Sequence, residues 1–171
     1  MVNTKETDSP AREEMHDHGR CVEEALEGAA EICTRRGAKL TPLRLKVLEL
    51  VWSGHRPISA YDILERLQSG NKKAAPPTVY RALDFLLGEG LVHRLESLNA
   101  YIGCPDPATH HNGQFLICEE CRKVTELNDP SIGEVLRRSA QKQGFSIRSG
   151  MVEIIGLCPQ CQMTANAERH A

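Results

Sequence analysis

Aromatic residues, long apolar runs and an export signal are scarce or missing in this sequence of 171 residues. Aromatics make up only 4% of the chain, so aliphatic side chains must build most of the core. No stretch approaches the roughly 20 consecutive apolar residues of a membrane-spanning helix, and the N-terminus lacks the basic-then-apolar order of a signal peptide. We therefore expect a cytoplasmic protein without a membrane partner.

The sequence also lacks the short motifs of zinc-dependent enzymes. It has no H-E-x-x-H, which would put a glutamate general base beside two zinc ligands, and no H-x-E paired with P-C-x-x-C, the pattern of zinc deaminases. A zinc hydrolase or deaminase is therefore an alternative for which no general base is found. We expect no enzyme activity and no small organic substrate.

Four of the seven cysteines form two C-x-x-C pairs. A pair with two residues between fits a turn around one metal ion, and two pairs can complete the tetrahedral sulfur shell typical of structural zinc. The four candidate ligands are Cys118, Cys121, Cys158 and Cys161. A thioredoxin-like redox role for the second pair is disfavoured, because the chain ends soon after it and leaves no room for the helix and strands of that pattern.

Charge is distributed unevenly along the chain, although the net charge is only -2. Residues 1–34 carry three Lys/Arg and nine Asp/Glu, whereas residues 35–97 carry eleven Lys/Arg and six Asp/Glu. A basic segment inside an acidic chain provides the local positive field that a phosphate backbone would need. A solvated, mildly basic surface would give the same balance, so charge alone does not decide between the two.

The basic segment has the element order of a winged helix. Apolar residues recur at helical spacing in four stretches, and three of these begin at cap or proline signals. The expected helices run from Cys21 to about Arg36, from Pro42 after Thr41 to Gly54, from Ser59 towards Asn71, and from Pro76 to Gly88. Residues 91–96 and 101–103 then read as a hairpin. In a winged helix one helix enters the major groove of DNA and the hairpin contacts the backbone.

A proline-containing linker separates this segment from a smaller second domain. Closely spaced prolines after Cys104 favour extended chain. The expected elements beyond are strands at 114–118 and 123–127, a helix at 131–142, and a strand or broken strand pair over 145–157, interrupted at Ser149-Gly150. An α/β domain of about 55 residues is only marginally stable alone, so a structural metal has a physical role here.

A second group of candidate metal ligands lies around this linker. Once the C-x-x-C cysteines are assigned, Cys104 remains, with His110 and His111 near it, and His93 and Glu126 lie at strand-like positions on either side. Sulfur, imidazole and carboxylate together suit zinc better than calcium or magnesium, although single histidines are more often structural or surface residues. A metal held from both sides of a hinge would couple its binding to domain orientation.

The expected fourth helix carries a distinctive run, Pro76-Pro77-Thr78-Val79-Tyr80-Arg81-Ala82-Leu83. Followed by a hairpin and a C-x-x-C domain, this run resembles the ferric uptake regulator family. The wider match extends from Ser59-Ala60-Tyr61-Asp62 to Val92-His93-Arg94-Leu95-Glu96-Ser97 and is similar to the zinc-sensing branch, the zinc uptake regulators. The resemblance covers about residues 22–161, and the helix run is far more specific than either C-x-x-C pair.

This resemblance implies a homodimeric, zinc-activated transcriptional repressor that binds operator DNA and controls zinc uptake genes. It implies two zinc ions per chain: a structural ion at the four C-x-x-C cysteines and a regulatory ion at the hinge. The regulatory ligands would be His93, Cys104, His111 and Glu126, with His110 adjacent to the third. The DNA-facing positions would be Tyr61, Thr78, Tyr80 and Arg81, and candidate phosphate contacts are Lys39, Arg44, Lys46, Lys72 and Lys73.

The expected fold class is α+β, with an N-terminal winged-helix DNA-binding domain followed by a small α/β dimerisation domain that holds structural zinc. The expected divisions are a disordered leader at 1–19, the winged helix at 20–103, a hinge at 104–112, the dimerisation and zinc domain at 113–162, and a tail at 163–171.

One position departs from the iron and peroxide sensors of the family. Those sensors carry a histidine three residues before the first C-x-x-C cysteine, where this chain has Phe115. Cys104 also argues against an iron sensor, because a thiolate ligand favours zinc over ferrous iron. The alternatives left open are a same-family sensor of iron or manganese and a zinc-binding interaction module without affinity for DNA.

Overall fold

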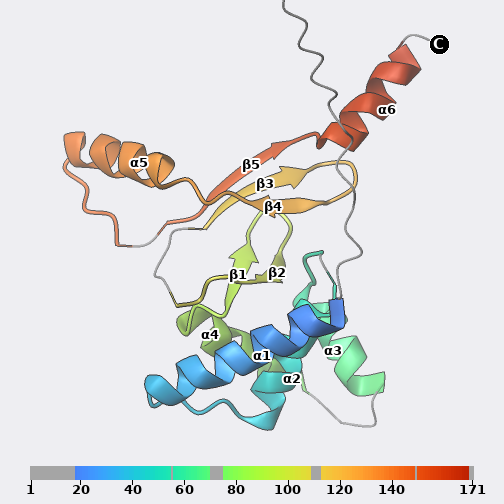
Figure 1. Ribbon diagram of the computed structural model, residues 1–171, viewed down its shortest axis with the longest axis vertical. Coiled ribbons are helices and arrows are strands. Elements are labelled where there is room, and N and C mark those ends of the chain that lie inside the picture. The colour runs from blue at the N-terminus through green and yellow to red at the C-terminus, as the bar shows by residue number, and fades with distance from the viewer. Residues whose placement is uncertain (1–17, 55, 70–74, 109–112, 149, 170–171) are drawn as a thin grey trace, which may run out of the picture.

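The computed structural model describes residues 18–54, 56–69, 75–108, 113–148 and 150–169. Helices and a two-stranded hairpin form the N-terminal part, and a three-stranded sheet with two helices forms the C-terminal part (Figure 1). The hairpin lies between the N-terminal helices and the C-terminal sheet. This arrangement confirms the predicted α+β class, whereas most of the predicted leader, residues 1–17, lies outside the described ranges.

Four helices pack around one apolar core. They are α1 (His18–Arg35), α2 (Pro42–Trp52), α3 (Ala60–Ser69) and α4 (Pro76–Gly88). α1 begins three residues before the predicted start, so the last two residues of the predicted leader are helical. The Thr41 hydroxyl accepts the N–H of Arg44 at 3.4 Å, and the Ser59 hydroxyl accepts the N–H of Asp62 at 3.1 Å. Both predicted caps are therefore confirmed.

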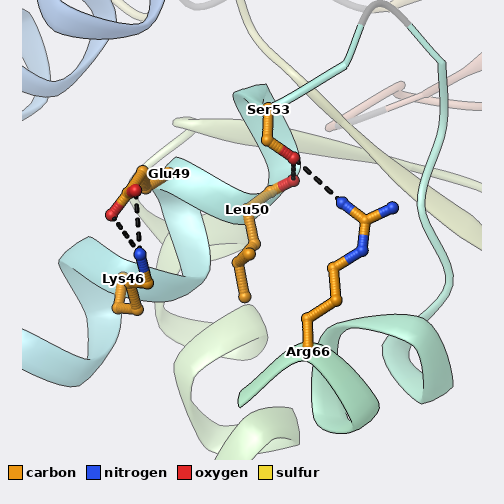
Figure 2. Close-up of polar contacts among 5 residues, drawn as sticks. All are labelled: Lys46, Glu49, Leu50, Ser53 and Arg66. Carbon is orange, nitrogen blue, oxygen red and sulfur yellow. Dashed lines mark hydrogen bonds and ion pairs between the residues drawn. The ribbon is translucent and has the colours of Figure 1, made fainter. Parts of the chain in front are cut away.

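A short chain of polar contacts fixes the end of α2 against α3 (Figure 2). The Ser53 hydroxyl, at the C-cap of α2, donates to the Leu50 carbonyl at 2.8 Å and accepts from the Arg66 guanidinium at 3.0 Å. On the preceding turn, the Lys46 ammonium pairs with the Glu49 carboxylate at 2.8 Å. Because Arg66 lies on α3, the contact with Ser53 links the two helices.

The predicted hairpin forms from β1 (Val92–Leu95) and β2 (Ala100–Gly103), which pair antiparallel. Gly103 lies against Trp52 of α2, and a Cβ atom at this position would overlap the indole ring, so glycine allows this close approach. Tyr101 is buried in the same core as the helices. The hairpin and the four helices therefore form one packed unit.

The C-terminal sheet has the strand order β4-β3-β5. The central strand β3 (Gln114–Cys118) pairs antiparallel with β4 (Val124–Glu126) and parallel with β5 (Val152–Gly156). The connection from β4 to β5 contains α5 (Pro130–Lys142), and α6 (Pro159–Arg169) follows the sheet. Because β3 and β5 are parallel, the chain between them must cross from one end of the sheet to the other. β4 and α5 form this crossover.

Two details of the C-terminal part differ from the sequence prediction. A strand or broken strand pair is predicted over 145–157, but residues 145–148 form no strand and only Val152–Gly156 pairs with β3. The register agrees with this later start, because the first residue of β3, Gln114, lies opposite Val152. A tail is predicted from residue 163, whereas α6 continues through Arg169 after a favourable proline start.

The C-terminal part leaves much of its apolar surface uncovered. α5, all of which is described, has no buried residue. Exposed apolar side chains of this part include Leu116, Val135, Leu136, Ile154, Ile155 and Met163. Three of them line an open cleft of about 1010 Å³ beside the sheet and α6. None of the helices within the described residues is long and apolar enough to cross a membrane.

Candidate metal centres and nucleic-acid interface

The four C-x-x-C cysteines meet at one end of the C-terminal sheet. Cys118 pairs with Gly156 at the ends of the parallel strands β3 and β5, so the two cysteine pairs follow neighbouring strand ends. The Cys118 N–H donates to the Lys123 carbonyl at 2.9 Å, and Arg122 has a positive φ of 58°. The chain therefore reverses direction in a tight turn around the first cysteine pair. The four ligand atoms all lie within 4.8 Å of one another.

The sulfur spacing fits a tetrahedral zinc ion. The Sγ atoms of Cys121 and Cys158 lie 3.7 Å apart. Two sulfurs bound to one zinc at about 2.3 Å in a tetrahedron are separated by about 3.8 Å. The four residues predicted from spacing are therefore brought together in an arrangement that could hold structural zinc.

The protein favours a thiolate at one of these cysteines and opposes ionisation at another. Hydrogen bonds from the N–H groups of Cys121 and Cys158 lower the pKa of Cys118 to about 6. Hydrogen bonding with Cys158 raises the pKa of Cys161 to about 12. Four sulfurs in so small a volume repel one another when ionised, and a divalent cation would remove that repulsion. The electrostatics therefore agree with a bound metal.

Two of the predicted hinge ligands, His93 and Glu126, face one another between the two parts of the molecule, and a third, Cys104, lies where the linker begins. His93 lies on β1, Cys104 directly follows β2, and Glu126 ends β4. Nε2 of His93 lies 3.7 Å from Oε1 of Glu126. Burial, with a smaller effect of the Glu126 carboxylate, raises the pKa of the Cys104 thiol to about 12. The fourth predicted ligand, His111, and its neighbour His110 lie outside the described residues.

The hinge residues are gathered less tightly than the cysteines. Among the described residues, the four cysteines are the only group of three or more His, Cys, Asp or Glu residues whose ligand atoms all lie within 4.8 Å of one another. His93 and Glu126 nevertheless come from different parts of the molecule and already face one another. A metal ion at this place would therefore be held by residues of both parts, whereas the cysteine site lies entirely within one part.

Phe115, the residue that departs from the iron and peroxide sensors, packs directly against a candidate ligand. It is buried, and its ring meets the His93 imidazole edge-on at 5.3 Å between centroids and 63° between planes. A Cβ atom on Gly113 would press on both rings. Phe115 therefore offers no ligand atom and instead limits how the His93 imidazole can turn.

The linker is anchored to the N-terminal part by Arg36, just after α1. Its guanidinium donates to the Pro107 carbonyl at 3.2 Å and pairs with the Glu89 carboxylate at 3.4 Å. Glu89 is the C-cap residue of α4. One side chain thus connects α4 with the residues that follow Cys104. Sequence patterns gave no signal for Arg36, because its partners lie 53 and 71 residues away.

The four residues predicted to face DNA are all exposed. Tyr61 lies in the first turn of α3, and Thr78, Tyr80 and Arg81 lie on α4. α4 buries Val79, Ala82, Leu83 and Leu86, which directs the remaining side chains outwards. No described carboxylate lies within 4 Å of the Arg81 guanidinium. Its charge and its five N–H donors are therefore available to a partner.

Two of the predicted phosphate contacts are engaged within the protein. The Arg44 guanidinium stacks over the Phe85 ring at 3.6 Å, and Lys46 pairs with Glu49. Arg44 thereby helps to hold α2 against α4 rather than extending towards solvent. The other three candidates are Lys39, which is exposed, and Lys72 and Lys73, which lie outside the described residues.

Comparisons with known proteins agree with these features. The sequence matches the ferric uptake regulator family over residues 35–155. It is 43% identical over 151 residues to the zinc uptake regulation protein of Escherichia coli (strain K12), and the match covers 87% of each chain. The solved structure of a zinc uptake regulator complexed with zinc and DNA is 40% identical. It superposes with a TM-score of 0.80, covering 85% of this chain and 97% of that one.

A pair of solved structures of one relative bears on the arrangement of the two parts. Holo XcZur is 38% identical and superposes with a TM-score of 0.76, covering 82% of this chain and 98% of that one. Apo XcZur, at the same 38% identity, has a TM-score of 0.50 over 84% of this chain and 99% of that one. Since the sequence relation is the same, the described chain is arranged more like the holo structure than like the apo structure.

Proposed function

Because the chain belongs to the ferric uptake regulator family, we propose that it is a zinc-responsive transcriptional repressor that binds operator DNA and controls zinc uptake genes. The observation that carries this proposal is the approach of His93 on the hairpin to Glu126 on the C-terminal sheet, 3.7 Å apart, with Cys104 directly after the hairpin. The E. coli relative is a zinc uptake regulation protein, and a similar solved structure is complexed with zinc and DNA. As a regulator of transcription, the protein acts in the cytoplasm.

Two zinc sites with different tasks account for the two clusters. Cys118, Cys121, Cys158 and Cys161 would hold a structural ion that fixes the end of the C-terminal sheet. His93, Cys104, His111 and Glu126 would hold a regulatory ion at the hinge. The placement of the two clusters supports this division, since the four cysteines lie within the C-terminal part, whereas His93 and Glu126 come from different parts of the molecule. The first site stabilises one domain, and the second responds to zinc.

Regulation follows from which elements carry the hinge residues. Bound zinc supplies the positive charge that holds a thiolate, imidazoles and a carboxylate at short fixed distances. Cys104 must lose its proton for this, which its burial opposes in the absence of the ion. Bringing His93 to Glu126 fixes the hairpin against the sheet. To raise the DNA-competent arrangement from 1% to 99%, zinc must favour it by about 5.5 kcal/mol.

A homodimer would present two copies of α4 to DNA. The uncovered apolar surface of α5, β5 and α6 supports such a dimer, because a second copy would remove it from water. Two recognition helices would then reach half-sites about one helical turn, ~34–36 Å, or a multiple of it apart. In each copy, Arg81 would read a purine edge, and the exposed hydroxyls of Tyr61, Thr78 and Tyr80 would contact the duplex nearby.

The test measures metal content and DNA binding together. A duplex is first selected from a random pool with the zinc-loaded protein, and its binding is then followed across buffered free zinc, iron(II) and manganese(II). Cys104→Ser should remain a folded dimer with one zinc per chain but lose zinc-dependent binding. Cys21→Ser, which alters another cysteine outside both proposed sites, should bind as the unaltered protein does. Full zinc-dependent DNA affinity in Cys104→Ser would contradict the proposed regulatory site at the hinge.

A further inference from the structure

On the face of the C-terminal sheet towards the hairpin, three side chains lie side by side on the three adjacent strands. Phe115 on β3 pairs with Glu126 on β4 and with Glu153 on β5. Paired residues on adjacent strands project to the same side of a sheet. Glu126 belongs to the proposed zinc site and Phe115 packs against His93. Glu153 completes the row, yet it belongs to neither zinc site.

Glu153 holds the tip of the hairpin through both of its carboxylate oxygens. Its Oε1 accepts the Glu96 N–H at 2.7 Å, and its Oε2 accepts the Ser97 N–H at 3.0 Å. These two N–H groups open the turn that follows β1, in which the Asn99 N–H bonds back to the Glu96 carbonyl at 3.2 Å. Two main-chain donors side by side suit a carboxylate, which accepts through both oxygens.

The surroundings of this carboxylate favour its ionised form. Partial burial raises the pKa of Glu153, but hydrogen bonds from the Ser97 hydroxyl and from the Ser97 and Glu96 N–H groups outweigh it, so the pKa lies below its usual range. Hydrogen bonds to a charged acceptor are roughly twice as strong as those between neutral groups. The contact is therefore stronger than an ordinary pair of turn hydrogen bonds.

The contacts between hairpin and sheet extend along the whole of β1. At one end His93 faces Glu126 across 3.7 Å. In the middle Leu95 is buried with Phe115 and the neighbouring sheet residue Ile117. At the far end Glu153 holds the turn. Because the hairpin shares its core with α4, anything that orients the hairpin against the sheet also orients the predicted recognition helix.

We propose that Glu153 is a positioning residue that latches the hairpin tip to the C-terminal sheet, so that zinc has to close only the opposite end of the same interface. This inference rests on the proposed function, since it assigns to Glu153 a part of the domain orientation that zinc completes. The latch stabilises this arrangement of hairpin and sheet by the same free energy whether or not zinc is bound, and it is absent from other arrangements. Losing it therefore raises the zinc concentration needed for DNA binding rather than abolishing the response.

The test compares Glu153→Gln with a matched control, Glu134→Gln, an exposed glutamate of α5. Binding of the duplex selected by the unaltered protein is followed by fluorescence anisotropy across buffered free zinc. Glu153→Gln keeps the shape of the side chain but turns an NH₂ group towards one main-chain N–H. From the loss of a hydrogen bond to a charged group, we expect half-maximal DNA binding to need about tenfold more free zinc. The affinity at saturating zinc should stay within about twofold, and Glu134→Gln should shift neither.

A midpoint for Glu153→Gln that coincides with that of Glu134→Gln would overturn the latch. So would an equal loss of DNA affinity at every zinc concentration, because a general folding defect gives that result. Ser97→Ala, which removes only the hydroxyl, supplies a milder partner. Ser97→Ala should shift the zinc midpoint of DNA binding when Glu153 is present and should cause no further shift in the Glu153→Gln background. If the two shifts add, the two residues do not share a contact.

A measurement without DNA separates failure of the latch from failure of the proposed function. Amide hydrogen exchange at Glu96 and Ser97 should be protected in the unaltered protein and accelerated at least tenfold in Glu153→Gln. Unchanged exchange would overturn the latch even if zinc-dependent DNA binding is found. Accelerated exchange in a protein that shows no zinc-dependent DNA binding would support the contact but contradict the function.

Discussion

The two parts of this molecule reach stability by different means. The N-terminal part has sixteen buried residues in one core, drawn from all four helices and the hairpin. Of its described residues, the C-terminal part contributes only Phe115 and Ile117 as buried members of a second cluster, together with Leu95 of the hairpin. Its long helix α5 has no buried residue. The N-terminal part is therefore held by its own core, and the C-terminal part requires help from outside it.

The difference follows from size and from what each part must do. A domain of about 55 residues buries too little apolar surface to offset its conformational entropy. The four cysteines and the uncovered apolar side chains of α5 and β5 are where we propose the two remaining means, a metal and a second copy of the chain. The N-terminal part needs neither, because it has a core of its own.

Loss of the proposed structural metal should produce the largest difference in stability between the two parts. Cys121→Ser leaves three thiols, and structural zinc is worth on the order of 10 kcal/mol in small domains. We expect the C-terminal sheet to unfold while α1 to α4 stay folded. Hydrogen exchange by peptide, with zinc content measured on the same sample, checks this. Cys21→Ser is the control, and concerted unfolding of both parts would contradict their independence.

Truncation of a core side chain in α4 should destabilise the N-terminal part and leave the C-terminal part folded. Leu83 is fully buried, so Leu83→Ala should lower the free energy of unfolding of the N-terminal part by about 2–5 kcal/mol. The zinc content should remain unchanged. Denaturant unfolding followed by Trp52 fluorescence reports on this part alone. Leu45→Ala, at a leucine that is 37% exposed, should cost much less. Equal costs would mean that the helices are not held by this core.

A charge on the uncovered face should affect assembly and leave the fold of each chain intact. Ile154 is 45% exposed in a single chain and lies beside the open cleft with Leu116 and Met163, on the side of the sheet opposite Glu153. In the proposed dimer, Ile154→Asp would bury a carboxylate without a partner. We expect dimer dissociation to be favoured by at least about tenfold, with zinc still bound by the four cysteines. Sedimentation velocity over a range of concentrations measures it, with Leu45→Asp as the control; an unchanged dimer would place the interface elsewhere.

The contrast between the parts also explains what the sequence could predict. Helix starts such as Thr41 and Ser59, and the apolar stripe of α4, depend on neighbours within four residues, so their signals are local. The cysteine pairs were predictable because ligand spacing is itself a local pattern. Contacts between distant segments leave no such pattern. Glu153 meets Ser97 across 56 residues, and Arg36 meets Pro107 across 71.

The same reasoning applies to residues whose engagement depends on packing. Arg44 looks like a free basic residue in the sequence, but the Phe85 ring lies 3.6 Å from its guanidinium in the fold. The strand predicted over 145–148 fails for a related reason, because only the register with β3 decides where β5 begins. Local propensity describes what a segment can form, and its partners decide what it does form.

The smallest expected effect on stability lies on the exposed side of the N-terminal part, where DNA binding can change while the free energy of unfolding does not. Arg81 is exposed and has no described carboxylate within 4 Å. Arg81→Ala should leave unfolding unchanged and weaken binding to the selected duplex by about 1–3 kcal/mol, the range of one bidentate contact to a base. Arg81→Lys keeps the charge but loses the planar fork, so it should recover binding to random DNA but not to the selected duplex. Anisotropy titrations of both duplexes at one salt concentration make the comparison, because phosphate contacts depend on salt. An equal loss on both duplexes in Arg81→Ala would show that Arg81 contacts only the backbone.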